Sequence, residues 1–238
     1  MKVAYGFFSF TEVTDPSEHR SYNAWHQLDH LPEQFPLPGI VYGQRWVSTP
    51  ACRAARLTSD AALDPIQYVT CYLMAEPIDE TLDEFFALGA ELHRLDRFHT
   101  HRRAHLTGPF RVVTAHAAPR TQISAAAVPF RPHRGIYVTV DEAAADVPSD
   151  NDGALTDVPG VAGVWTFSTV DGLTSRRWSA GHRRITVCWL DDDPLAVATR
   201  IEPHVTSRSD PDGRSSRRTF AGPFETITAW QWDWFDAP

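Results

Sequence analysis

The segment from residue 22 to residue 30 contains the side chains of this sequence that are best suited to proton transfer. His26 and His30 are four residues apart, so on a helix they lie on one face, one turn apart. Histidine titrates near neutral pH, which suits it to take or give a proton in a reaction. Tyr22 and Asp29 lie near the same stripe. We therefore predict that Tyr22, His26, Asp29 and His30 are catalytic.

The hypothesis gives each of these groups a role. His26 takes a proton from the substrate, and His30 or Tyr22 stabilises or protonates the oxyanion that develops. We expect His30 to lie in the last turn of its helix, where the negative end of the helix dipole favours the protonated imidazole. Asp29 or Glu33 then orients one of the two rings.

Other interpretations of the two histidines stay open. His26 can be a hydrogen-bonded packing residue, with Asp29 and His30 at an exposed helix end. The pair could also chelate a divalent metal, but a third ligand such as Glu33 or His116 would be needed and no zinc signature supplies one. A haem would require an axial histidine in a roomy apolar pocket. The sequence contains no Gly-rich phosphate loop, which argues against a nucleotide cofactor, and no serine nucleophile elbow. We expect no cofactor, while haem and a divalent metal stay open.

Neighbouring aromatic and polar residues are candidates for substrate binding. Trp25 lies on the histidine helix and Glu33 lies just beyond it. The strand expected at residues 40–48 places three alternate side chains on one face, where they could line a pocket under the helix: Tyr42, Gln44 and Trp46.

Two further clusters are interpreted as structural. The basic, histidine-rich segment 93–106 is expected to be a solvated loop. Trp230, Trp232 and Trp234 alternate, so they face one side if they belong to a last strand. We expect them to pack between sheets or to clamp the C-terminus.

The helix that carries the histidines is expected to run from Asp15 to about His30. Asp15 can cap its first turn, and Pro16 suits the first helical position. Pro32 disfavours helical geometry at Leu31 and lacks a backbone donor, so we expect the helix to end there.

The chain shows an internal repeat. The first half has the order β-α-β-β-α-β, which is the ferredoxin-like order. The turn at residues 37–40 (LPGI) recurs at residues 158–161 (VPGV), and Gly-Pro-Phe occurs at both 108–110 and 222–224. The similar runs YVTCYLM and ITVCWLD would place Cys188 where Cys71 lies in the first half. We predict a duplication.

The predicted units cover residues 1–118 and 132–238, joined by a Pro-rich linker. One unit covers only one face of its sheet with helices, so two units can bury their bare faces together. The fold class is therefore α+β, with two tandem ferredoxin-like units packed sheet to sheet as an intramolecular dimeric α+β barrel. Residues 141–160 contain neither histidine nor tryptophan, so the C-terminal unit is expected to be degenerate and mainly structural.

Composition excludes several classes of protein. The chain has 238 residues, 42% of them apolar, and a net charge of −8. This charge argues against binding to nucleic acid or to anionic membranes, and no apolar run approaches the ~20 residues of a membrane span. The N-terminus does not resemble a signal peptide, and three cysteines match no zinc spacing. We expect a cytoplasmic protein whose partner is a small molecule; the sequence also permits a homodimer.

The residues Trp25-His26-x-x-x-His30-Leu31-Pro32-Glu33, followed by Leu-Pro-Gly at 37–39 and the strand to Trp46, carry a family resemblance. The sequence resembles the dimeric α+β barrel superfamily, and specifically its EthD-like branch. The resemblance covers the whole chain in architecture, but its motif covers only residues 22–46. It implies a pocket between helices and sheet.

That superfamily includes cofactor-independent monooxygenases, dehydratases, isomerases and haem proteins, so the fold alone hardly limits the reaction. The histidines favour a cofactor-independent dehydratase, isomerase or lyase that acts on a small aromatic or polyketide-like carbonyl compound. The alternatives are a cofactor-independent monooxygenase and a non-catalytic protein that binds a small ligand or haem.

Overall fold

The computed structural model describes residues 3–143, 153–169, 182–206 and 217–236. In these ranges the first half contributes the strands β1 (Val3–Val13), β2 (Ile40–Val47), β3 (Thr58–Ser59), β4 (Tyr68–Ala75) and β5 (Arg102–Ala117). The second half contributes β6 (Gly135–Ala143), β7 (Val161–Thr169), β8 (His182–Leu190) and β9 (Arg217–Thr226).

The helices are α1 (His19–Trp25), a π-helical turn (His26–His30), α2 (Leu31–Gln34), α3 (Pro50–Ala54), α4 (Ile78–Arg94) and α5 (Pro194–Thr206). Short 3-10 segments lie at Pro16–Glu18, Pro119–Thr121, Ala125–Phe130 and Gly153–Asp157. Among the described residues no helix is both long enough and apolar enough to cross a membrane.

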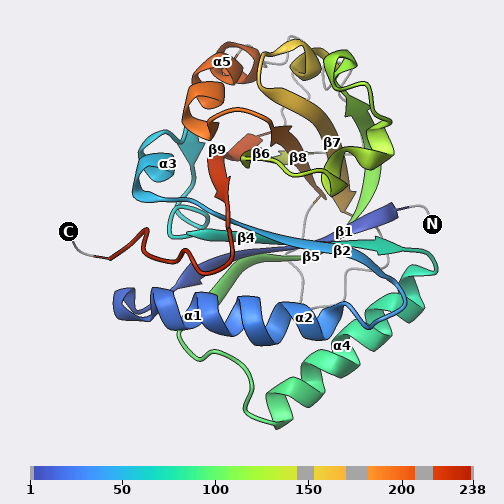
Figure 1. Cartoon of the computed structure of the whole chain (residues 1–238), viewed down its shortest axis with the longest axis vertical. Coiled ribbons are helices and arrows are strands. Elements are labelled where there is room, and N and C mark those ends of the chain that lie inside the picture. The colour runs from blue at the N-terminus through green and yellow to red at the C-terminus, as the bar shows by residue number, and fades with distance from the viewer. Residues whose placement is uncertain (1–2, 144–152, 170–181, 207–216, 237–238) are drawn as a thin grey trace.

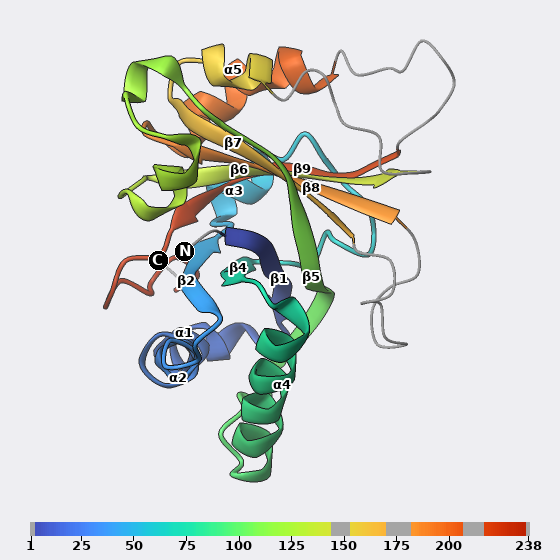
Figure 2. The same cartoon turned by 90° about the vertical axis from the view of Figure 1, so that its right-hand side faces the viewer.

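The strands form one antiparallel sheet in the order β2-β4-β1-β5-β7-β8-β6-β9-β3. β2 also pairs with β9, through Trp46 opposite Thr226 and Val47 opposite Glu225. The sheet therefore closes on itself, and the helices lie outside it (Figures 1 and 2). This is an α+β architecture built around one large antiparallel sheet.

The recurring sequence motifs occupy matching places in the two halves. Gly108 lies opposite Phe8 on β1, and Gly222 lies opposite Val138 on β6. In both turns the residue after glycine donates its N–H to the residue before proline: Ile40 to Leu37 and Val161 to Val158, each at 3.1 Å. The strand order within each half is also the same, because β2-β4-β1-β5 corresponds to β7-β8-β6-β9.

The predicted match between the two cysteines is wrong. Cys71 pairs with Phe8, and the residue that pairs with Val138 on β8 is Val187. Cys71 belongs to the interior core, while Cys188 packs on the outer side with the residues of α5. A shift of one residue along a strand exchanges the two faces of the sheet, and the similarity of letters does not reveal the shift.

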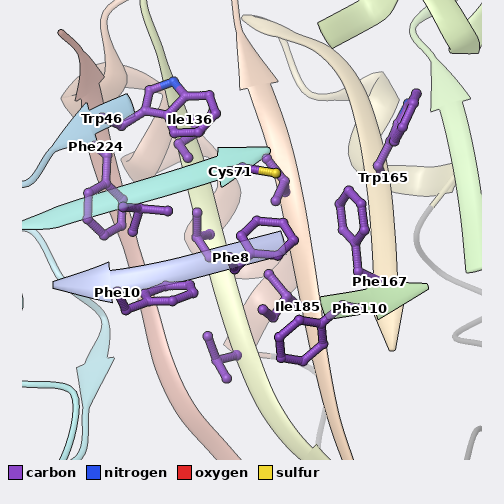
Figure 3. Close-up of a cluster of buried hydrophobic side chains, with 14 of the residues drawn as sticks. Phe8, Phe10, Trp46, Cys71, Phe110, Ile136, Trp165, Phe167, Ile185 and Phe224 are labelled. Atoms are coloured by element: carbon purple, nitrogen blue, oxygen red, sulfur yellow. The ribbon is translucent and has the colours of Figure 1, made fainter. Parts of the chain in front are cut away.

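The interior of the closed sheet is a single apolar core made by both halves. Phe8, Phe10 and Phe110 come from the first half, and they meet side chains such as Phe167 and Phe224 from the second half (Figure 3). Phe8 and Phe167 make an edge contact with ring centroids 4.9 Å apart. The two inner faces are therefore buried against each other, as expected for a sheet with helices on one side only.

The helices cover the outer faces. α1, α2 and α4 lie on the outside of the first half's strands, and α5 lies on the outside of the second half's strands (Figures 1 and 2). Of the segment 141–160, the structure describes the end of β6 and a 3-10 helix at Gly153–Asp157, while residues 144–152 lie outside the described residues.

The predicted end of the histidine helix is also wrong, since the chain stays helical to Gln34. The N–H of Leu31 donates to the carbonyl of His26, five residues back, in a π-helical turn. This wider turn inserts one residue ahead of Pro32 and lets the proline occupy the start of a new helical segment, where its missing N–H is tolerated.

The last tryptophans do not belong to a strand. β9 ends at Thr226, and Trp230 has a positive φ of 69°. The tail instead crosses to the first half, where Trp232 packs with Tyr22 and Phe235 stacks on His19 at 4.0 Å. The C-terminal tail is therefore a clamp on helix α1.

Candidate functional site

A cavity of about 270 Å³ lies between the outer face of the first half's sheet and its helices. The helix segment 22–34 contributes Tyr22, Trp25, His26, His30 and Gln34. The strands contribute Phe7, Ser9, Thr11, Thr70, Tyr72, Arg102, Ala104 and Thr107, and the remaining wall consists of Phe85, Phe86, Gly89 and Phe98. Four of the nine predicted site residues thus line one cavity: Tyr22, Trp25, His26 and His30.

The π-helical turn places the aromatic rings of the histidine segment. Trp25 stacks on His30 with centroids 4.8 Å apart and planes 23° apart. His26 and His30 meet edge to face at 5.1 Å. Trp25, His26 and His30, which lie in or next to this turn, all line the cavity.

Both histidines are neutral at pH 7. Burial lowers the pKa of His26 well below its usual 6.5, and the Arg45 charge lowers it further. Burial also lowers the pKa of His30 to about 4, with the Arg102 charge as the second cause. The predicted protonation of His30 by the helix dipole is wrong, because the helix continues to Gln34 and burial, followed by the Arg102 charge, lowers the pKa of this imidazole.

No carboxylate orients either ring. Nε2 of His26 lies 3.4 Å from Oγ1 of Thr70, and Nδ1 of both histidines is buried without a partner. The predicted orienting groups bind Arg97 instead, at 2.9 Å from Asp29 and 2.6 Å from Glu33. Neither carboxylate lines the cavity.

Arg97 links these two acids to the cavity wall. Its carbonyl oxygen accepts a hydrogen bond from the indole N–H of Trp25 at 2.7 Å. Asp29 and Glu33 therefore hold the segment that fixes Trp25, and through the stacking contact they position His30. Their role is one of positioning rather than contact with a ligand.

Arg102, the first residue of β5, is the one charged residue in the cavity lining. Its Cζ lies 5.5 Å from the ring centroid of Trp25 and 4.8 Å from that of Phe98. In the described part of the chain its guanidinium forms no ion pair and no hydrogen bond. Burial lowers its pKa.

Arg45 lies behind the cavity, on the helix-facing side of β2. The residue is 2% exposed, and its guanidinium donates to Oδ1 of Asn23 at 2.9 Å. Its Cζ is 5.2 Å from the Tyr22 ring and 5.7 Å from the Tyr68 ring. Its Nε and the other terminal nitrogen are buried without a partner, so this cation too lacks a carboxylate.

Three predicted substrate-binding residues lie elsewhere. Tyr42, Gln44 and Trp46 do share a face, and Tyr42 donates to Gln44 at 3.1 Å. That face is the interior of the closed sheet, where Trp46 and Tyr42 belong to the apolar core. Alternation along β2 sends Arg45 to the helix side instead, so the structure does not bring these three residues to the cavity.

The segment 93–106 is more than a solvated loop, because Phe98 and Arg102 line the cavity. The ring of His99 lies 5.7 Å from that of Tyr22, and its Nε2 is 3.0 Å from Oγ of Ser21. In the sequence, an aromatic residue among arginines, Phe98, was the feature that could have indicated that this segment belongs to the site. Within the described ranges no group of three or more His, Cys, Asp or Glu side chains could hold a metal ion.

No family model matches the sequence, and no curated protein matches it either. The chain is similar in structure to a candidate chlorite dismutase, with a TM-score of 0.54 and 10% identity over 98% of each chain. A candidate monooxygenase from Lactobacillus acidophilus gives a TM-score of 0.43 and 7% identity, covering 96% of this chain and 100% of the other. At these identities the first likeness shows a shared α+β barrel fold, and the second adds no argument.

Proposed function

We propose that this chain is a cofactor-independent enzyme that removes a proton from a small aromatic carbonyl compound bound in the cavity. The observation that supports it is an imidazole that is neutral at pH 7, held by stacking at the wall of an aromatic cavity beside a cation. A neutral imidazole can accept a proton, and a nearby cation favours the anion that results.

His30 is our choice for the base, whereas the sequence-based hypothesis gave that role to His26. Nε2 of His26 is engaged with Thr70. The His30 ring is less buried and lies near Arg102, whose charge is the second cause of its lowered pKa. His26 then acts as the neighbour that packs against the base.

Tyr22 is the proposed donor to the oxyanion. Its ring lines the cavity, and its hydroxyl has no hydrogen-bond partner among the described residues. When His30 removes a proton next to the carbonyl, the C–H electron pair forms an enolate and the carbonyl oxygen gains the charge. The Tyr22 hydroxyl donates to that oxygen, with the Arg45 cation behind its ring.

Two outcomes follow from the enolate. If His30 returns the proton to a different carbon, the reaction is an isomerisation. If a β-hydroxyl leaves with that proton as water, it is a dehydration. In the monooxygenase alternative, the substrate carbanion gives its electrons to dissolved oxygen, which is then the oxidant.

A haem does not suit this cavity. Pockets for drug-sized ligands usually measure about 300–1,000 Å³, and the space here is about 270 Å³. Neither imidazole stands in an open apolar slot as wide as a porphyrin, since one is bonded to Thr70 and the other is stacked on Trp25. We therefore assign no step to haem.

We also propose that the chain is a fusion of two ferredoxin-like units, residues 1–118 and 132–238, of the EthD-like type. The equal strand order, the matching register of both Gly-Pro-Phe motifs and the equal turn hydrogen bonds support this. The candidate site then belongs to the first unit.

The test uses 2-tetralone, an aromatic ketone with acidic C–H groups. Nuclear magnetic resonance in D₂O follows the loss of its α-protons, and an oxygen electrode with anthrone detects the monooxygenase outcome. We expect the wild type to accelerate exchange and His30→Gln to lose the acceleration. Equal rates in the wild type, His30→Gln and His26→Gln would refute the assignment of the base.

A further inference from the structure

We propose that the cavity selects an aromatic carboxylate and that Arg102 is the residue that recognises its anionic group. This rests on the proposed function in one respect, because it names the substrate class of the same site. Nothing in the proton-transfer step itself requires a permanently charged substrate, so the two ideas can fail separately.

The charges around the cavity motivate the inference. The chain carries a net charge of −8, yet no Asp or Glu lines the cavity and Arg102 does. Arg45, the next cation behind the wall, has no carboxylate partner in the described residues either. Because the histidines are neutral, this cavity is positive in an acidic protein, and an anion would balance it.

Other arginines close to Arg102 in the sequence do have carboxylate partners. Arg97 binds two acids, Asp29 and Glu33. Arg103, the next residue after Arg102, lies 3.8 Å from Glu12. The protein therefore supplies carboxylates to arginines in the same region, and it leaves the cavity arginine without one.

The geometry of Arg102 suits a planar carboxylate. Trp25 and Phe98 contact the guanidinium through their rings. A guanidinium keeps its N–H donors in its own plane, and these match both oxygens of a carboxylate. In the described part of the protein no group occupies those donors.

The rest of the lining specifies an aromatic body. Phe7, Tyr72, Phe85, Phe86 and Phe98 surround the space with rings. An inorganic anion would satisfy the arginine but would leave these rings in contact with water. Aromatic walls with a few placed polar groups are typical of sites for small organic ligands, which favours an arenecarboxylate.

The experiment is calorimetric titration of the full chain with 2-naphthoate and with 2-naphthamide, a neutral molecule of nearly the same shape, at pH 7.5. We expect the wild type to bind the acid about ten- to one-hundredfold more tightly than the amide, as charge-assisted hydrogen bonds allow. Arg102→Gln should bind both ligands alike. Arg103→Gln, the matched control, should keep the wild-type preference.

Two further variants keep the test decisive. Arg102→Lys preserves the charge but loses the two-donor fork, and we expect it to keep only part of the preference. His30→Gln should keep the full preference while losing proton exchange, so that failure of catalysis and failure of recognition are distinguished. Equal binding of acid and amide by the folded wild type, or a full preference in Arg102→Gln or Arg102→Lys, would overturn the proposal.

Discussion

The two halves have the same strand order, but their helix-facing sides carry different side chains at matching positions. Arg45 on β2 lies opposite Thr70 on β4, and the matching pair in the second half is Thr166 on β7 opposite Thr186 on β8. Where the first half has Tyr72, the second half has Cys188. At a few matching positions, therefore, the two halves differ in the size, charge and aromatic character of their side chains.

The second half fills the space under its helix with apolar side chains. Val197, Ile201 and Val205 of α5 are buried with Val164 and Tyr137 of the strands. These side chains form one buried apolar cluster between the helix and the strands. The first half instead lines its space with rings, hydroxyl groups and two histidines.

Buried arginines show the same contrast. Arg218 of β9 binds Asp141 of β6 at 2.9 Å, and the aspartate side chain is only 7% exposed. In the first half, Arg45 and Arg102 have no such partner in the described residues. The second half neutralises its buried charge internally, whereas the first half leaves positive charge beside a cavity. Four predictions test this contrast.

The largest expected effect is on proton exchange. His30→Gln should slow the exchange of 2-tetralone by about 10²- to 10⁴-fold, the usual contribution of a general base. The control is His133→Gln, because His133 is also buried and burial also lowers its pKa to about 4. His133 does not line the cavity, so its variant should exchange at the wild-type rate. A similar loss in both variants would show that burial alone explains the effect.

Arg218→Met should destabilise the fold by about 3–5 kcal/mol, since Asp141 would be left buried without its partner. Urea denaturation followed by circular dichroism measures the change. Arg217→Met is the matched control: its ion pair with Glu142 is exposed, and solvent screening should leave the stability nearly unchanged. A loss below 1 kcal/mol for Arg218→Met would remove the contrast in charge between the halves.

Acid should destabilise the fold through the buried histidines. The pKa of His30 is about 4 in the folded chain and about 6.5 in an unfolded one, so the unfolded chain takes up the proton first. Stability is full above about pH 6.5 and falls as the pH approaches 4. Removing His30 should reduce this loss by an amount on the order of 1–3 kcal/mol, measured as unfolding free energy at pH 8, 6 and 4.5.

His133 should behave in the same way, because its pKa is also about 4. Equal flattening of the pH dependence in His30→Gln and His133→Gln is the expected result. It would show that both histidines have a lowered pKa and that His30 differs from His133 only in lining the cavity. If neither substitution changed the pH dependence of stability, the conclusion that both histidines are buried in the neutral form would be contradicted.

The smallest effect is expected for Arg45→Met. This substitution removes a buried cation with two unpaired donors, while Asn23 loses one hydrogen bond. Removing a buried cation that has no carboxylate partner also removes the cost of taking that charge out of water. We expect a stability within about 1 kcal/mol of wild type, or above it. A loss beyond 3 kcal/mol by urea denaturation would mean that the charge is compensated after all.

The α+β barrel architecture could be predicted from the sequence, as could the gathering of Tyr22, Trp25, His26 and His30. Helical spacing and strand alternation are local properties, so they can be recognised in a short stretch of sequence. The π-helical turn could not be predicted, because the local sequence pattern favours a different structure there. Pro32 argues for a helix end, and only the observed hydrogen bond from Leu31 to His26 shows how the chain continues.

Arg102 and Phe98 could not be assigned to the site from spacing, because about seventy residues separate them from the histidines. The choice between Arg45 and Trp46 depended on which face of β2 meets the helices, and alternation alone does not decide that. The cysteine match failed by one residue for the same reason. In each case the missing information was the orientation of a strand relative to distant parts of the chain.

The two seams that join the halves are unequal in length. Seven residue pairs link β5 to β7, whereas β9 makes two pairs with β2 and two with β3. The short seam is continued by the N–H of Ile227, which donates to the carbonyl of Arg45 at 3.3 Å, and the tail then reaches Tyr22. Separating β2 from β9 would therefore also remove the tail from its contact with the helix that carries the histidines. Through this tail, the second half helps to hold helix α1 of the first half in place.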